Sequence, residues 1–112
     1  MIAINILHDQ AHHVLGAKIR GHAGKATYGS DVICSAVSVL ALSTINGLEH
    51  VAHAKIEKSV GEGDIYFRLA AQNDENAMAA SQILLQSFAN AIQNIAEENA
   101  EYVTAAYEEV KK

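Results

Sequence analysis

The sequence predicts an α+β fold of two layers, in which two helices pack on one mostly antiparallel sheet. Three observations carry this prediction. Segments in which apolar and polar residues alternate occur as two pairs, at 2–7 with 14–21 and at 52–57 with 64–69. An apolar pattern with helical period follows each pair, and a last alternating segment ends the series. The expected order is therefore ββαββαβ, and strand pairs separated by helices favour this fold class.

The first pair of segments predicts an antiparallel hairpin. Isoleucine alternates with other residues through 2–7, and apolar residues alternate with Lys18 and Arg20 through 14–21. Asp9-Gln10 supplies residues that favour a turn between the two strands. A short connection of this kind makes sequential strands neighbours in the sheet.

The first helix is expected to begin at Asp31. The segment before it, Ala23 to Ser30, has no apolar period and is expected to be a loop. After Asp31, six residues fall on one face at helical spacing: Cys34, Val37, Ser38, Ala41, Ile45 and Leu48. Asn46-Gly47 is a typical helix stop and predicts the end of this helix.

The second half of the chain repeats the pattern. The predicted elements are a strand at 52–57, a turn at Gly61-Glu62-Gly63, a strand at 64–69, a helix at 74–96 and a strand at 103–107. The long apolar stripe of the second helix is expected to be core. Residues 108–112, with their four charged side chains, are expected to be a solvated end.

Size and composition limit the function. The chain has 112 residues, which suits one domain over 1–112. Its net charge of −5 and scattered basic residues argue against a nucleic-acid surface, which needs clustered Lys and Arg. With 5% aromatic residues, stacking platforms for bases are not expected either.

The expected compartment is the cytoplasm. A single cysteine cannot form an internal disulfide, so the fold does not depend on oxidation. The short apolar N-terminus lacks the basic flank and length of a signal peptide, and no apolar run is expected to reach the length of a membrane span. Six histidines and one cysteine carry no paired zinc signature, so we expect neither a metal nor a cofactor.

Cys34 is the candidate nucleophile. If Asp31 is the N-cap, Cys34 occupies the third helical position, where free backbone amides and the helix dipole favour a thiolate. The same amides would stabilise the oxyanion of a tetrahedral intermediate. The alternative is that Cys34 is a small buried apolar residue, which is common for cysteine. Asp31 has two roles open to it, a helix cap or an orienting partner for a histidine.

His22 is the candidate general base. It ends the second predicted strand, and the loop from Ala23 to Ser30 is long enough to fold back toward Cys34. The glycines Gly21, Gly24 and Gly29 permit backbone shapes that would let this loop close over a substrate. An ordinary surface connection is the alternative. Ser38, one helical turn beyond Cys34, either hydrogen-bonds in the site or simply allows close packing.

Two motifs in this region resemble a known family. Gly21-His22-Ala23-Gly24, Gly29 and the run Asp31-Val32-Ile33-Cys34-Ser35-Ala36-Val37-Ser38 resemble the ribosomal-processing cysteine protease family, Prp. The likeness extends over the whole chain in length and element order. The sequence differs from the family pattern in two places. Ser35 stands where alanine is usual, and the aromatic residue of the loop is Tyr28, whereas many family members have an aromatic nearer the histidine.

The resemblance implies a cytoplasmic homodimeric endopeptidase. Its substrate would be a bacterial large-subunit ribosomal protein, the one numbered twenty-seven, cut after two phenylalanines and before a small residue to remove a short N-terminal extension. His22 would be the base and Cys34 the nucleophile. The supporting residues implied are Asp31, Ser38, Gly21, Gly24 and Gly29.

Two other functions remain open on the sequence. A binding module of the same fold would associate with the ribosomal protein without cutting it. A redox sensor would use Cys34 and, with one cysteine per chain, would form disulfides between chains.

Overall fold

The computed structural model describes residues 1–21 and 28–111, with side chains given for 1–21 and 32–111. The elements are β1 (Ile2–His8), β2 (Val14–Arg20), α1 (Tyr28–His50), β3 (Ile56–Gly61), β4 (Asp64–Leu69), α2 (Glu75–Glu98) and β5 (Val103–Glu109). This is the predicted order ββαββαβ.

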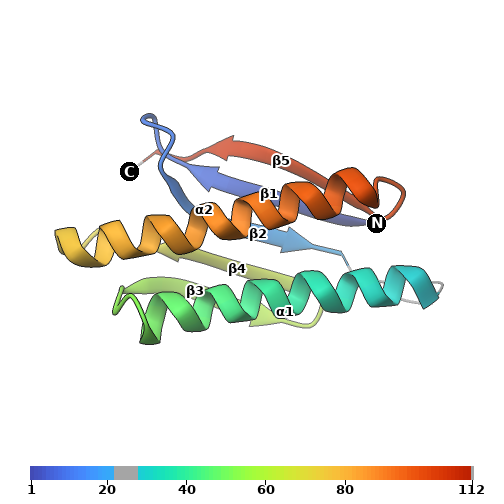
Figure 1. The fold of residues 1–112 in the computed structure, drawn as a ribbon, viewed down its shortest axis with the longest axis horizontal. Coiled ribbons are helices and arrows are strands. Elements are labelled where there is room, and N and C mark those ends of the chain that lie inside the picture. Colours follow the sequence, from blue (N-terminus) through green and yellow to red (C-terminus); the bar gives the residue numbers. More distant parts are fainter. Residues whose placement is uncertain (22–27, 112) are drawn as a thin grey trace.

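One sheet contains all five of these strands, in the spatial order β3-β4-β2-β1-β5. The pairs β1–β2, β2–β4 and β3–β4 are antiparallel, while β1 and β5 run parallel. The predicted mostly antiparallel sheet is confirmed, with a parallel pair at one edge. Both helices lie on the same face of the sheet, α1 over the β3–β4 side and α2 over the centre (Figure 1).

The core lies between the helices and the sheet. The sheet contributes the residues of the predicted alternation, including Ile2, Ile4 and Ile6, each at most 1% exposed. Phe67 of β4 and Phe88 of α2 meet edge to face with their ring centroids 5.5 Å apart, a geometry that aromatic pairs favour. The apolar stripes predicted for both helices therefore supply the other half of this core.

The predicted start of α1 is wrong by three residues. The helix already includes Tyr28, Gly29 and Ser30, so Asp31 is its fourth residue and not its N-cap. Gly29 and Ser30 therefore belong to the helix and not to the loop that was expected from 23 to 30. Gly and Ser disfavour helix interiors, which is why the sequence pattern placed the boundary after them.

The predicted end of α1 is also wrong, because Asn46 and Gly47 lie inside the helix. A Cβ at Gly47 would come within 3.3 Å of the side chain of Leu84 on α2. The absence of a side chain at Gly47 thus allows the two helices to approach. The chain leaves the helix later, through His53, whose φ of 54° lies in the left-handed region.

The strand boundaries differ from the prediction most at β3 and β5, and by one residue at the ends of β1 and β2. The strand predicted at 52–57 is found at Ile56–Gly61, so Gly61 belongs to β3 and not to the predicted turn. Ala52 and Ala54 are buried as the alternation requires, but they lie in the connection before β3. The amide of Ala54 donates to the carbonyl of Leu48, so this segment packs against the end of α1. At the other end, β5 continues to Glu109, because its backbone pairs with β1 as far as His8. The carboxylate of Glu108 also accepts hydrogen bonds from the sheet residues Asn5 (2.8 Å) and Lys18 (3.0 Å).

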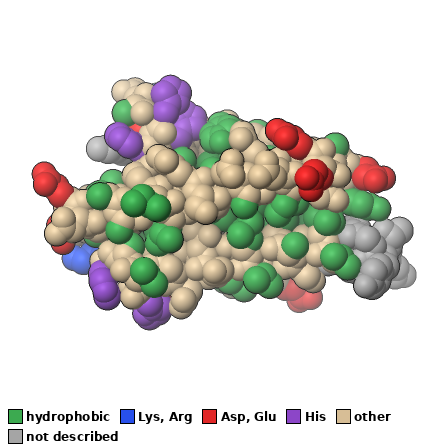
Figure 2. Space-filling model, in the orientation of Figure 1, with side chains coloured by type: hydrophobic (Ala, Val, Ile, Leu, Met, Phe, Trp, Pro, Cys, Tyr) green, Lys and Arg blue, Asp and Glu red, His purple; other side chains and the backbone are tan. Residues whose placement is uncertain are grey.

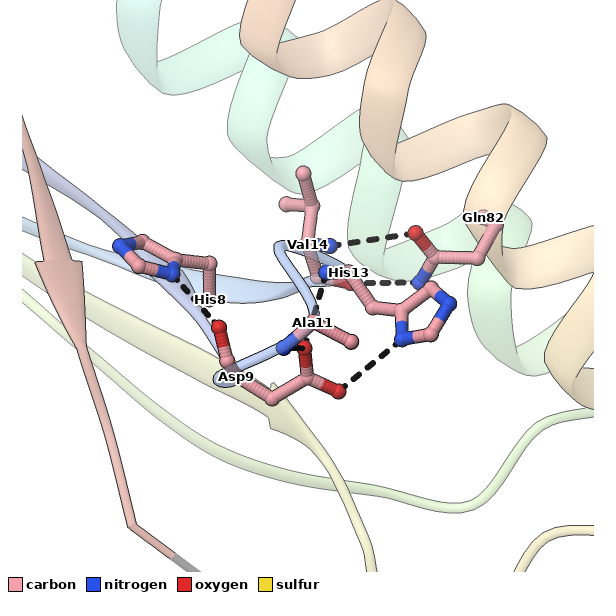
Figure 3. Close-up of polar contacts among 6 residues, drawn as sticks. All are labelled: His8, Asp9, Ala11, His13, Val14 and Gln82. Carbon is pink, nitrogen blue, oxygen red and sulfur yellow. Dashed lines mark hydrogen bonds and ion pairs between the residues drawn. The ribbon is translucent and has the colours of Figure 1, made fainter.

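Hydrogen bonds order the turn between β1 and β2 (Figure 3). The Asp9 carboxylate accepts from the amides of Ala11 and His13, both at 2.9 Å, and contacts His13 Nδ1 at 3.1 Å. Partial desolvation raises the pKa of Asp9, but the bonds and charge of His13 and the bond from Ala11 outweigh it, so the pKa lies below its usual value. Gln82 of α2 both donates to and accepts from the backbone of Val14.

Among the described residues, α1 has one segment, Val32–His50, that by length and composition alone would suffice to cross a membrane. The expectation that no segment reaches this length is therefore wrong. One face of the same helix carries Val37, Ala41 and Leu48, each at most 1% exposed. These side chains belong to the core described above, so α1 acts here as a core helix of the domain.

Replacing Asp74 by alanine is expected to lower the free energy of unfolding by about 1 kcal/mol, because a helix cap is lost. Asp74 is the N-cap of α2, and its carboxylate accepts from the amide of Ala77 at 2.8 Å. Urea unfolding followed by circular dichroism measures the change. Gln86→Ala, at an exposed site in the same helix, is the control. Equal stabilities of the two variants would contradict a stabilising cap.

Candidate active site

A small cleft of about 70 Å³ lies between the first half of α1 and the turn between β3 and β4. Its walls include Cys34 and Ser38 from the helix and Gly61, Gly63 and Asp64 from the hairpin. Core residues of β1, β2, β4 and α1 close its apolar floor. The cleft therefore combines the only cysteine of the chain with a backbone-rich wall.

Cys34 is a free thiol, half-buried on the face of α1 that turns toward the sheet. Its side chain packs partly against the core, and the remainder borders the cleft. The residue is therefore neither a fully buried apolar side chain nor a fully exposed thiol. Part of the Cys34 side chain is therefore accessible from the cleft.

The helix start changes the physical setting of this thiol. With α1 beginning at Tyr28, Cys34 is the seventh helical residue, so the prediction that it occupies the third position is wrong. Its amide lies within the regular helix, where amides bond to carbonyls four residues earlier. The dipole effect also falls off within the first turn. Free helical amides at Cys34 therefore do not supply the oxyanion donors that the sequence suggested.

Ser38 lies where the sequence placed it, one turn beyond Cys34 on the same face. It is half-buried and borders the cleft. Val37, between them in sequence, points into the core and is 1% exposed. The helix thus presents a thiol and a hydroxyl to the same small space.

Gly21 brings the end of β2 to this cleft. Its φ is +87°, and a Cβ at this position would lie 2.5 Å from the carbonyl oxygen of Met1. Its amide donates to the carbonyl of Gly63 at 3.1 Å, which joins the end of β2 to the hairpin wall. Gly21, the residue directly before His22, is therefore part of the cleft wall. His22 itself and Gly24 lie outside the described residues, as does the expected loop through residue 27.

The hairpin wall was not identified as part of the site from the sequence. The sequence pattern at Gly61, Gly63 and Asp64 indicates only a turn and the start of a strand. Their place at the cleft follows from the pairing of β2 with β4, in which Arg20 lies opposite Asp64. The signal in the sequence was the pair of glycines around Glu62, which leaves this wall without large side chains.

Two histidines outside this region, His8 and His12, form a separate pair. His8 and His12 stack with their ring centroids 5.2 Å apart, and His8 also approaches Tyr107 at 6.2 Å. Within residues 1–21 and 28–111, no three His, Cys, Asp or Glu side chains are grouped as metal ligands would be. We assign no metal to the described residues.

Comparison with known proteins places the chain in a family. The model of the family described as cysteine protease Prp matches residues 1–104. The ribosomal processing cysteine protease Prp of Bacillus subtilis is 25% identical over 97 residues, which cover 85% of this chain and 87% of that protein.

Two solved structures share the fold. The crystal structure of SMU.848 from Streptococcus mutans has a TM-score of 0.80 and 27% identity, covering 98% of this chain and 96% of that one. The S. aureus ribosomal processing protease Prp, in complex with a substrate peptide, has a TM-score of 0.84 and 21% identity, covering 96% and 100%. With the family match over nearly the whole chain, these findings establish that the protein belongs to the cysteine protease Prp family, whose members hydrolyse peptide bonds.

Proposed function

We propose that this protease removes a short N-terminal extension from a bacterial large-subunit ribosomal protein, with Cys34 as nucleophile and His22 as general base. One observation carries the assignment. The single cysteine borders a cleft whose wall includes Gly21, the residue directly before His22. A cysteine nucleophile and a histidine base at one site are the minimum equipment of a cysteine protease.

The reaction proceeds in two halves. His22 accepts the proton of the Cys34 thiol as the sulfur forms a bond to the scissile carbonyl carbon. The carbon–nitrogen bond of the tetrahedral intermediate then breaks, and the imidazolium returns the proton to the leaving amine. A water, deprotonated by His22, hydrolyses the resulting thioester. This releases the N-terminal extension as a carboxylic acid and regenerates the thiol.

Five further residues are proposed to support the site. Gly21 fixes the position from which the chain continues to His22, since its amide bonds to Gly63. Ser38 borders the cleft, and we propose that its hydroxyl donates a hydrogen bond to a substrate carbonyl. The family resemblance assigns supporting roles to Gly24, Gly29 and Asp31. For Asp31 the role is not an N-cap, because the helix begins before it.

The substrate assignment rests on relatives. The B. subtilis and S. aureus relatives carry the name ribosomal processing protease, and the S. aureus protein has been solved with a substrate peptide. We propose the same class of substrate here, cut after two phenylalanines and before a small residue. A cleft of about 70 Å³ suits a small side chain next to the cleaved bond.

We further propose that the protein works as a cytoplasmic homodimer. Between Val32 and Leu48 the sequence of α1 contains no charged residue. Val32 and Val39 on this helix are 47% and 66% exposed. Figure 2 shows green and tan surface across the middle of the helical face, with charged side chains near its ends. An uncharged, partly apolar face is typical of an interface between protein subunits.

Incubation with the N-terminally extended ribosomal protein tests the function. We expect mass spectrometry to show a product shortened at the bond after the two phenylalanines, and a protease mass increased by the acyl fragment at early times. Tight binding without shortening would indicate the non-catalytic binding module instead. Reversible loss and recovery of an activity with mild peroxide and a thiol, again without shortening, would indicate a redox sensor.

A further inference from the structure

The cleft at Cys34 is too small for a large apolar side chain of the substrate. A cavity that binds benzene has a volume of about 150 Å³, roughly twice the volume of this cleft. Apolar residues that flank the cleaved bond therefore require a surface next to the cleft. Such a surface has to be continuous with the two walls that carry Cys34 and Gly61.

The two flanks of α1 differ in what they face. One flank packs on α2, where Gly47 approaches Leu84. The opposite flank carries Ser38, Leu42 and Glu49 at helical spacing, starting at the cleft. The Glu49 carboxylate accepts a hydrogen bond from Lys58 of β3 at 2.8 Å, so this flank faces β3. Leu42, between the cleft and that ion pair, is 44% exposed.

Strand β3 forms the facing wall. It is an edge strand of the sheet, since β4 is its neighbour on one side only. Val60 lies opposite Ile65, whose buried side chain faces the helices, so Val60 points to the same side. Val60 is nevertheless 53% exposed, and it directly precedes Gly61 at the cleft. Leu42 and Val60 are thus exposed apolar residues on two walls that meet at Cys34.

The free edge of β3 offers backbone partners as well. Gly61 and Asp64 form the pair that closes the hairpin, so the backbone groups of Gly61 point toward β4. Because the direction alternates along a strand, the N–H and C=O groups of Lys58 and Val60 point away from β4 toward the open edge. An extended peptide is a natural partner for such groups. In Figure 1 this edge runs beneath α1 toward its N-terminal half.

We propose that the substrate peptide adds as a strand to the free edge of β3 and lays its apolar side chains over Val60 and Leu42. Its scissile bond then reaches Cys34 past Gly61. We call this proposed surface, between Leu42 and Val60, the groove, and the ion pair between Glu49 and Lys58 lies at its far end. The inference rests on the proposed protease function and adds to it a binding surface on the described residues.

Kinetics on a synthetic peptide with two phenylalanines before a small residue test the groove. Val60→Pro removes one outward N–H and is tolerated on an edge strand. It is expected to raise KM about tenfold with kcat unchanged, because one hydrogen bond to substrate is lost. Leu42→Ser is expected to raise KM about fivefold through loss of apolar contact. Ile83→Ser, at a 73% exposed site on α2, is the matched control and should leave KM unchanged.

The outcomes separate the groove from the function. If the wild type cleaves the peptide and both Val60→Pro and Leu42→Ser keep its KM, the groove is wrong while the protease function stands. If the wild type cleaves neither this peptide nor the extended ribosomal protein, the proposed function fails first. Should Val60→Pro not fold by circular dichroism, Val60→Ser replaces it, with an expected KM increase equal to that of Leu42→Ser.

Discussion

Replacing Cys34 by alanine is expected to abolish cleavage of the N-terminally extended ribosomal protein, with kcat falling by about a million-fold. No other thiol in the chain can take over, because Cys34 is the only cysteine. The acyl-enzyme then cannot form, and only binding of the substrate remains. Stopped time courses analysed by mass spectrometry measure both the product and the missing covalent intermediate.

Matched variants make this result specific. Ser35→Ala changes the exposed neighbour of Cys34 on the same helix and is expected to keep full activity. His22→Ala is expected to lose activity to a similar extent, since catalytic residues that act as a unit are not additive. The free energies of unfolding of both inactive variants, measured in urea, should lie within about 1 kcal/mol of the wild-type value. Product formation by pure Cys34→Ala at the wild-type rate would remove the thiol from the mechanism.

Gly21→Ala is expected to lower the free energy of unfolding by about 2–3 kcal/mol and to reduce cleavage strongly. An L residue at a positive φ costs about 1–2 kcal/mol, and Gly21 has a φ of +87°. The new Cβ would also approach the carbonyl oxygen of Met1 to 2.5 Å, which forces a backbone shift. That shift acts at the cleft wall directly before His22, so activity should fall even at temperatures where the variant is folded.

Gly61→Ala is the control for Gly21→Ala, because Gly61 borders the same cleft. A Cβ at Gly61 would meet its nearest heavy atom, the carbonyl oxygen of Asp64, only at 3.8 Å. Such a substitution typically changes stability by less than 1 kcal/mol. Thermal unfolding of both variants measures the difference. Equal melting temperatures would show that backbone strain at Gly21 is not important.

The fold was predictable because its alternation and helical period match the buried positions. Ile2, Ile4 and Ile6 are all buried, and so are Val37 and Ala41 on the predicted face of α1. The ends of the helices were less predictable, because one residue type can serve two structural roles. Gly47 indicates a helix stop by propensity, but in the structure it allows contact with Leu84 from a helix that is distant in sequence.

Half of the cleft was predictable for a different reason. Cys34 and Ser38 are one turn apart on one helix, so their common face follows from local geometry. Gly61 and Gly63 reach the cleft only because β4 pairs with β2. This pairing places the hairpin of β3 and β4 next to a strand from the first part of the chain. Strand order of this kind depends on long-range packing, and no pattern within either segment encodes it. The start of α1 was hard to predict because Gly29 and Ser30 have weak helix propensity. Since the helix begins before them, Cys34 lies beyond the first turn with its free amides.

The parallel pairing of β1 with β5 affects how the chain folds. Asn5 and Glu108, joined by a hydrogen bond, are separated by 103 positions. Contacts of such long range close large loops late, so folding slows as their share rises. During synthesis, β1 can pair with β5 only after the residues that separate Asn5 from Glu108 have been made. Until then this edge of the sheet lacks its parallel partner strand, so the last step in completing the sheet joins two segments made at very different times.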